Sequence, residues 1–395
     1  MNKLVKNTEL DGLKLKAKLY SENFADLTSD NMVKMLRAAL DDVDVIPVPE
    51  PEPVVKKILH FDSPDVTIPK YIFPSNWTCY KDIADLPVAS SSAERIRFSQ
   101  YHPNFRMSFV NSMPFNVVSG VDKVPLTIGP SPLGQPDESY SVDFQQYEKY
   151  KGSWPIGDWI QIENARAYFD NLDGVWVWKG VPDITSQRHI DSLVGKNSYD
   201  TDRHASVYSV DEKALYEFYK LFKYEDSWYA GYAVKWDCTK LPELQREPFD
   251  ASKNWWGHTS ADAAGLPILP LMLMAHELDG LNEIEHALRC TVPRHILEET
   301  PPLLPAVHRV HTWHNNKAIR MGERLRMKKN VIEKLHSSVP ERVLKVIRCM
   351  QKYGLIVTDI GGTNLGISCC PNTRWYDINT WTWELNLNDF EIVKV

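Results

Sequence analysis

An acid and an imidazole stand two positions apart in Asp202-Arg203-His204, where a polar turn leads into an apolar run. Side chains at positions i and i+2 of a strand project to the same side, so Asp202 and His204 could share a proton, as a general acid and the partner that orients it must. A salt-linked start of a strand explains the same residues without any chemistry. Asp202 and His204 are therefore candidate catalytic residues, with a structural alternative left open.

Asp262 is the candidate for a second carboxyl group. It lies within residues 259–270, where small residues, one carboxylate and two prolines alternate with no helical or strand period. Such a segment is more easily interpreted as a fixed loop than as core, and loops held that firmly often carry function. Glycoside hydrolysis needs two carboxyl groups, one protonated and one ionised, and Asp262 could supply one of them. A turn capped by the aspartate side chain explains Asp262 as simply.

Aromatic and basic residues near these acids could bind a substrate. Trp255-Trp256-Gly257-His258 leads into the segment and could form a platform on which a sugar ring stacks, with an aromatic core as the alternative. His286 follows Glu283 and Glu285 and precedes Arg289, a cluster that could bind or polarise a substrate oxygen. A strand end with satisfied polar groups is the more general explanation of that cluster.

The sequence predicts no cofactor and no metal site. His308, His311 and His314 recur at every third residue and could ligate a divalent metal from one face of a tight helix, but a strand would send His311 to the opposite face. Residues 359–364 are better interpreted as a glycine turn after a buried strand than as a phosphate loop. The 6 cysteines lack the spacings of zinc or iron–sulfur sites and are interpreted as buried thiols. The motifs of nucleophilic hydrolases and nicotinamide enzymes are missing from the sequence.

Composition favours a globular protein that does not bind nucleic acid. The 395 residues are 43% hydrophobic and 25% charged, which suffices for one large core or two modest ones. The net charge of -7 argues against a general affinity for nucleic acid or anionic lipid. No apolar run approaches the roughly 20 residues of a membrane-spanning helix, and the first residues lack the apolar segment of a secretory signal. The localisation is left open between a virus particle and the cytoplasm before assembly.

The chain is divided by its patterns of helix formers, prolines and strand formers. Residues 29–40 have the capping residues and apolar spacing of a helix. From Pro47 to Pro53, every second residue is a proline. This pattern favours an extended geometry that keeps the segments before and after it apart. We therefore predict an anchoring or interaction module (1–46), a Pro/Glu linker (47–67) and a β-rich body (68–395).

The body is predicted to be mainly β, with a sandwich or jelly-roll-like arrangement and a few helices. Short runs of β-branched or aromatic residues bounded by turn formers predict its strands. These runs are residues 115–118, 124–128, 174–178, 204–210 and 228–234. Helices are predicted for residues 214–219 and 340–353.

Several motifs of the body occur in the same order in one group of proteins. They are residues 73–77 with 83–88, 102–105, 114–118, 202–204, 259–270, 286–289, and 353–359 followed by 361–362. On these motifs the chain from about Phe73 to its C-terminus resembles a family of uncharacterised, usually secreted bacterial proteins. The resemblance implies a β-rich fold and an extracellular or surface role. Residues 271–279 depart from the family's pattern, so an activity that depends on that stretch would be altered here.

Two functions fit these features. The first is a β-rich module that binds, and if catalytic cleaves, a polysaccharide or surface glycan, while its N-terminal module contacts an assembly partner. The second is a non-catalytic structural component of a virus or phage particle or another large assembly, which the Pro/Glu linker and the altered residues 271–279 favour. Neither nucleic acid nor a membrane span is expected.

Overall fold

The structure of this chain is a computed structural model that describes part of the sequence. The described residues are 56–61, 63, 65–100, 105–110, 113–128, 152–163, 167–170, 175–178, 202–253, 255–279, 282–310, 318–335, 338–362, 364–371 and 374–395. The chain divides into two compact units, residues 1–55 and residues 56–395, and every described residue belongs to the second. The predicted N-terminal module, with its helix at residues 29–40, lies outside the described residues, as does the first part of the predicted linker.

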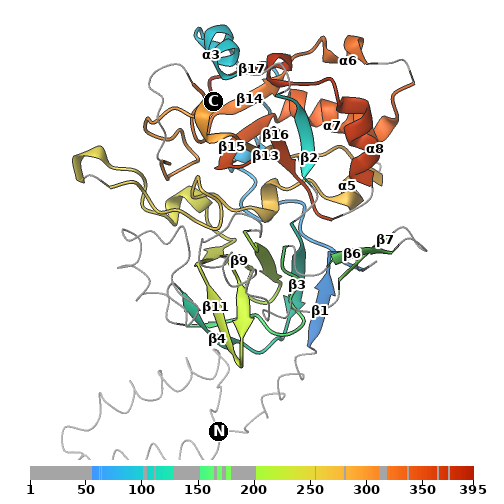
Figure 1. Cartoon of the computed structure of the whole chain (residues 1–395). Helices are drawn as coiled ribbons and strands as arrows, with labels where there is room; N and C mark the ends of the chain where they lie inside the picture. The colour runs from blue at the N-terminus through green and yellow to red at the C-terminus, as the bar shows by residue number, and fades with distance from the viewer. Residues whose placement is uncertain are drawn as a thin grey trace, which may run out of the picture. The chain divides into compact units, whose positions relative to one another are not determined.

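The described body is mainly β, as the sequence predicts. Its strands form sheets of five, four, six and two strands. Figure 1 shows the six-stranded sheet together with most of the helices at one end of the body, and the five- and four-stranded sheets side by side at the other. The sandwich or jelly-roll-like arrangement stays a prediction.

The five-stranded sheet is buried on both faces. Its order is β1 (Lys57–His60), β3 (Phe115–Ser119), β8 (Ala205–Ser209), β9 (Ala214–Tyr219) and β12 (Tyr232–Asp237). Along β9, Tyr216 and Phe218 enter a smaller core and Leu215 enters a larger one, an alternation that a strand buried on both faces requires. The helix predicted for residues 214–219 was therefore wrong, because pairing with β8 and β12 outweighs the local helix propensity. β1 lies within the predicted linker and pairs with β3.

The smaller core lies between this sheet and the four-stranded sheet. The four-stranded order is β10 (Phe222–Tyr224), β11 (Ser227–Ala230), β4 (Val124–Ile128) and β5 (Ser153–Trp154). The single strand predicted for residues 228–234 is divided at Gly231 between β11 and β12. A separate hairpin pairs β6 (Ala167–Asp170) with β7 (Val175–Trp178), the latter close to its predicted position.

The six-stranded sheet mixes parallel and antiparallel pairs. Its order is β17 (Phe390–Ile392), β14 (Arg324–Met327), β15 (Leu355–Ile360), β13 (Leu288–Val292), β16 (Leu365–Ser368) and β2 (Met107–Val110). The α-helices are α3 (Ser92–Ser99), α5 (Ala275–Asp279), α6 (Val331–Lys334), α7 (Glu341–Lys352) and α8 (Arg374–Thr382), and α7 confirms the helix predicted for residues 340–353. None of the described helices is long and apolar enough to cross a membrane.

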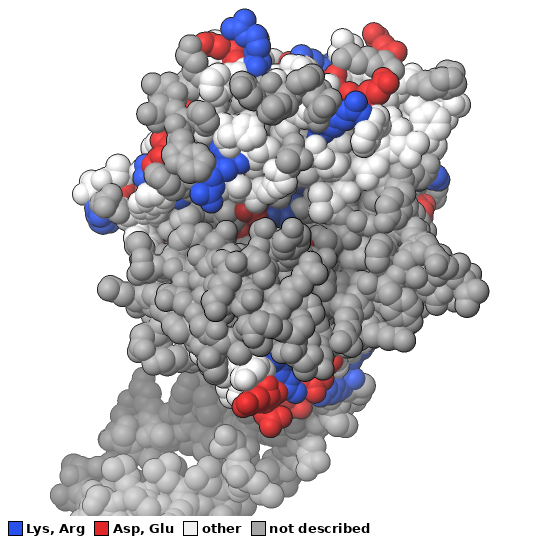
Figure 2. Space-filling model, viewed as in Figure 1, with Lys and Arg blue, Asp and Glu red and all other residues white. Residues whose placement is uncertain are grey.

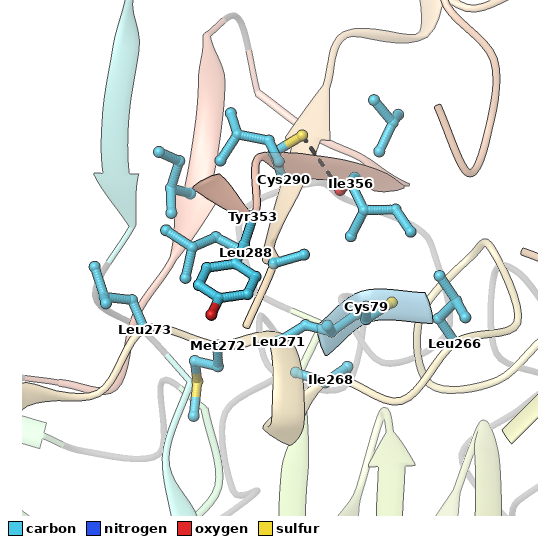
Figure 3. Close-up of a cluster of buried hydrophobic side chains, with 14 of the residues drawn as sticks. Cys79, Leu266, Ile268, Leu271, Met272, Leu273, Leu288, Cys290, Tyr353 and Ile356 are labelled. Atoms are coloured by element: carbon cyan, nitrogen blue, oxygen red, sulfur yellow. Dashed lines mark hydrogen bonds between the residues drawn. The ribbon is translucent and has the colours of Figure 1, made fainter. Parts of the chain in front are cut away.

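Residues 259–270, hereafter the joint loop, are irregular and at the same time buried. The sequence predicted a loop in preference to core, but most of this segment is inaccessible to solvent and ends in the short helix η5 (Leu269–Leu271). Figure 3 shows Leu266 and Ile268 of the joint loop beside Leu288 and Ile356 of the six-stranded sheet. The joint loop is therefore both an irregular loop and part of the core. All six cysteines are buried thiols outside any disulfide, which confirms their interpretation.

Candidate functional site

The joint loop is bonded to both large sheets. The Ala264 N–H donates to the Thr358 carbonyl of β15 at 2.8 Å, which ties the loop to the six-stranded sheet. The carboxylate of Glu217 in β9 accepts the N–H groups of Ile268 and Leu269, both at 2.8 Å, which ties it to the five-stranded sheet. Because the backbone groups of a buried irregular segment cannot bond to water, such partners must come from neighbouring elements. Hydrogen bonds to both sheets thus hold the joint loop in one conformation.

Small residues within the joint loop close its turn. The Ser260 hydroxyl accepts the Asp262 N–H at 2.9 Å and donates to the Leu266 carbonyl at 2.6 Å. Gly265 has a φ of +73°, and a Cβ there would lie 2.4 Å from the His258 carbonyl oxygen. Only glycine therefore fits, because an L side chain meets both backbone strain and a backbone clash. This turn presents Asp262 to β13.

His204, the residue before β8, donates from both ring nitrogens. Nδ1 lies 2.7 Å from Glu163 Oε2, and Nε2 lies 2.9 Å from the Ala261 carbonyl oxygen, which can only accept. Burial by itself lowers the pKa of His204, but the Glu163 carboxylate, with smaller contributions from Asp202 and Asp359, raises it to about 9. His204 is therefore a cation at neutral pH that connects β8 to the joint loop.

Arg289 of β13 lies between two carboxyl groups in the interior. Its Nε donates to Asp262 Oδ2 at 2.9 Å and its Nη2 to Asp359 Oδ2 at 3.2 Å, while Nη1 donates to the Ser368 hydroxyl. The side chains of Arg289 and Asp262 are both 0% exposed. Burial lowers the pKa of Arg289, but the two carboxylates raise it by more, so the guanidinium stays charged. Asp262 Oδ1 is buried and has no hydrogen-bond partner among the described residues.

A β-bulge directs Asp359 toward Arg289. The parallel register of β13 and β15 pairs Cys290 with Val357 but Thr291 with Asp359, so Thr358 is the extra residue. Without that extra residue the alternation of the strand would carry Asp359 to the opposite face of the sheet. The bulge therefore creates the contact between Asp359 and Arg289.

Asp359 also connects the buried cluster to the surface. Its side chain is 18% exposed, and Asp202 beside it is exposed. Burial and the Asp262 carboxylate raise the pKa of Asp359 well above its usual value, against the opposing charges of Arg289 and His204, and Asp202 raises it further. One carboxyl group with a raised pKa thus lies next to an exposed carboxylate.

The structure gathers some of the sequence-predicted site residues and separates others. Asp202, His204, Asp262 and Arg289 belong to one neighbourhood, which we call the Arg289 cluster together with Glu163 and Asp359. Glu163, Glu217 and Asp359 were not selected as site residues, because no spacing in the sequence indicated chemistry for them; Asp359 was considered only as part of residues 359–364. A hydrogen-bonding role for the buried Glu217 could have been suspected only if its segment had been assigned to a buried strand.

The predicted stacking residues have other neighbours. Trp255 and Trp256 are partly exposed, and the guanidinium of Arg309 lies 4.3 Å from the ring of Trp256. His258 accepts the Glu247 N–H at 3.0 Å and packs edge-on against Trp255 at 5.2 Å. These residues lead directly into the joint loop, so a platform built from them would be continuous in sequence with the segment that carries Asp262.

His286 lies away from Arg289, in a second cluster. Its Nε2 lies 2.9 Å from Glu277 Oε1. Burial lowers the pKa of His286, but the Glu277 carboxylate raises it by more, and the imidazolium in turn lowers the pKa of Glu277. Both residues line a cavity of about 500 Å³ with Lys70 and Glu285, which form an ion pair, and with the apolar side chain of Met274. We call these residues the cavity cluster.

Within the described part of the chain no group of three His, Cys, Asp or Glu residues could hold a metal ion. His308 Nδ1 donates to the Ala263 carbonyl at 2.7 Å, and burial lowers the pKa of His308 to about 4. His311 and His314 lie outside the described residues. β15 ends at Ile360, and Gly362 shortly after it has a φ of +58°, which agrees with the predicted glycine turn.

Charges of both signs are interspersed over the described part of the face in Figure 2, with no continuous basic stripe there. No protein-family model, curated protein or solved structure matches this chain. The resemblance to a secreted bacterial family therefore stays a prediction, and the function must be argued from the geometry.

Proposed function

We propose that the chain binds a glycan at the exposed edge of the Arg289 cluster and hydrolyses it with two carboxyl groups, Asp359 as the general acid and Asp202 as its partner. The observation that carries this proposal is the partly exposed Asp359 carboxyl, whose pKa is raised by burial and by Asp262. A carboxyl with a raised pKa keeps its proton to a higher pH, as an acid catalyst must.

The buried members of the cluster then act through Asp359. Asp262 and burial favour the protonated form of Asp359, while Arg289 and His204 limit that effect. In the reaction, Asp359 gives its proton to the glycosidic oxygen as the bond to the anomeric carbon breaks, while Asp202 takes a proton from the water molecule that attacks that carbon. Asp262, which is inaccessible to solvent, is a positioning residue in this scheme and not the second catalytic carboxylate.

A structural role in an assembly is the second candidate function. It is favoured by the burial of His204 and Asp262, whose described partners are all internal to the fold. Buried ion networks occur in proteins for stability and specificity as well as for catalysis. An assembly component needs the network only to hold the two sheets in place.

Glycan-array binding followed by measurement of released reducing ends separates the two functions. We expect binding, with release that Asp359→Asn reduces at least 100-fold, because general acid catalysis contributes about 10²–10⁴ in rate. Asp158→Asn, which alters an exposed carboxylate paired with Lys223, is the matched control and should leave release unchanged. Binding without release supports recognition alone, and the lack of both supports an assembly role.

A further inference from the structure

Glu217 is a fully buried carboxylate that the proposed reaction does not use. It lies in the middle of β9, and its side chain points to the face that the joint loop covers. Oε1 accepts the N–H groups of both Ile268 and Leu269 at 2.8 Å, and Oε2 accepts the indole N–H of Trp236 at 3.0 Å. The exposed fraction of Glu217 is 0%.

The sequence of the joint loop explains why it needs this acceptor. Pro267 and Pro270 flank Ile268 and Leu269 and have no N–H of their own, so the segment cannot continue a regular hydrogen-bond pattern on either side. Two consecutive buried N–H groups remain, and leaving them unpaired would be costly. A carboxylate oxygen has enough lone pairs to accept both, and its charge strengthens the bonds.

We infer that Glu217 is the positioning residue of the Arg289 cluster: its hydrogen bonds to Ile268 and Leu269 fix the C-terminal half of the joint loop and thereby the place of Asp262. The Ser260–Leu266 hydrogen bond carries this constraint from one half of the loop to the other. The inference rests on the proposed function for its catalytic consequence, but the positioning of the loop can be tested without it.

The surroundings of Glu217 make the protonated form tolerable. Burial raises the pKa of Glu217 to about 7, against the two backbone N–H groups and Trp236, and the Asp262 carboxylate adds to the rise. The titratable or charged groups near this face are Asp262 in the joint loop, Tyr208 on β8, Cys238 after β12, and Arg246 over the Trp236 ring. Since the folded pKa lies above the unfolded value of about 4.5, ionisation of Glu217 costs stability as the pH rises from about 4.5 to 7.

Because the ionised Glu217 costs stability, a variant at this position can separate a role in positioning the loop from a role in stabilising the fold. Glu217→Gln removes the buried charge but replaces one acceptor oxygen with an NH2 group, so the variant is expected to unfold near the wild-type temperature at pH 8. The single amide oxygen cannot accept both from the two loop N–H groups and from the Trp236 indole N–H, so one of these contacts is lost. We therefore expect hydrogen exchange at the amides of Ile268 and Leu269 to become about tenfold faster, and glycan release to slow by a similar factor through kcat.

Hydrogen exchange resolved to single amides, measured on the full chain from pH 5 to 8, is the decisive experiment. In the wild type, protection of the Ile268 and Leu269 amides, corrected for intrinsic exchange, should fall as the pH rises from about 5 to 7, because opening the loop admits solvent and favours the ionised form of Glu217; in Glu217→Gln it should be flat. Glu212→Gln is the matched control, because Glu212 bonds Lys123 and Lys235 and not the joint loop.

The outcomes distinguish the inference from the proposed function. Unchanged exchange in Glu217→Gln, or a change equal to that of Glu212→Gln, overturns the positioning role whatever the activity. Faster exchange in a chain that releases no reducing ends supports the positioning of the loop and removes the hydrolytic function. Faster exchange with unaltered kcat shows that the loop is held by Glu217 but that its position does not matter for catalysis, which overturns the catalytic part of the inference.

Discussion

The Arg289 cluster and the cavity cluster both pair a cation with a carboxylate, but they differ in access to solvent. Arg289 and Asp262 are 0% exposed, whereas the His286 and Glu277 side chains keep 10% and 18% of their surface and line a cavity of about 500 Å³. If a charged partner is removed, water can hydrogen-bond to the remaining group in the cavity cluster, but it cannot reach the remaining group in the Arg289 cluster. The cost of removing one charge should therefore be much larger in the Arg289 cluster, although the cavity cluster has a similar ion-pair distance of 2.9 Å.

The pKa values of two buried histidines show the same dependence on their partners. His204 faces the Glu163 carboxylate, and its pKa is raised to about 9, whereas His308 donates to the Ala263 carbonyl of the joint loop, and burial lowers its pKa to about 4. A carboxylate reverses the effect of burial on an imidazole, and a carbonyl does not. Burial therefore does not determine the charge of a histidine in this fold; the partner does.

The largest effect is expected from Arg289→Met. The methionine fills similar space but leaves the buried Asp262 and the largely buried Asp359 without their cation, which should lower the free energy of unfolding by about 3–5 kcal/mol at pH 7. Urea unfolding measures it, and part of the loss should be recovered at acidic pH, where the carboxyl groups become neutral. Arg348→Met is the control, because Arg348 bonds the exposed Glu283 and Glu341, and should cost no more than about 1 kcal/mol. Equal losses in the two variants would contradict the comparison.

A smaller effect should follow from the pH dependence of stability through His204. Its folded pKa of about 9 lies above the unfolded value of 6.5, so its contribution is complete below pH 6.5 and is lost as the pH rises through about 9. The shift corresponds to about 3 kcal/mol in the free energy of unfolding. Urea unfolding between pH 6.5 and 9.5 should show this decline in the wild type and a flatter profile in His204→Gln.

His308→Gln provides the control for that slope. The pKa of His308 is lowered to about 4, so its contribution is complete above pH 6.5 and is lost only as the pH falls toward 4. This variant should therefore retain the wild-type decline at alkaline pH. If His204→Gln also retained the decline in stability at alkaline pH, the Glu163–His204 pair would not be its cause.

The sequence predicted the parts of the site that depend on local pattern. Asp202 and His204 precede a run of strand formers, and the prolines and glycine of residues 259–270 indicate a fixed irregular segment, so both features could be recognised without tertiary contacts. The mainly β class followed from the same short runs and is confirmed. The prediction of the mainly β class succeeded because turn formers and strand formers act over a few residues.

The missed residues depend on pairing between distant parts of the chain. Glu217 was placed in a helix because its segment has helix-forming residues, and only the neighbours β8 and β12 make it a strand. Asp359 reaches Arg289 through a bulge at Thr358, which depends on the register between β13 and β15 and leaves no mark in the composition. A register and a cross-sheet contact are properties of two segments at once, so one segment cannot reveal them.

The smallest effect is expected in the cavity cluster. Glu277→Gln keeps an oxygen for the Met274 N–H but removes the charge that faces His286, and a hydrogen bond to a charged group contributes about 1.5–3 kcal/mol. We expect a loss at the lower end of this range in the free energy of unfolding, because the imidazole can release its proton and water in the cavity can bond to it. An NMR titration should show the pKa of His286 falling in Glu277→Gln, while the pKa of His204 stays unchanged. A loss as large as that of Arg289→Met would mean that the cavity is dry, and that solvent access does not distinguish the two clusters.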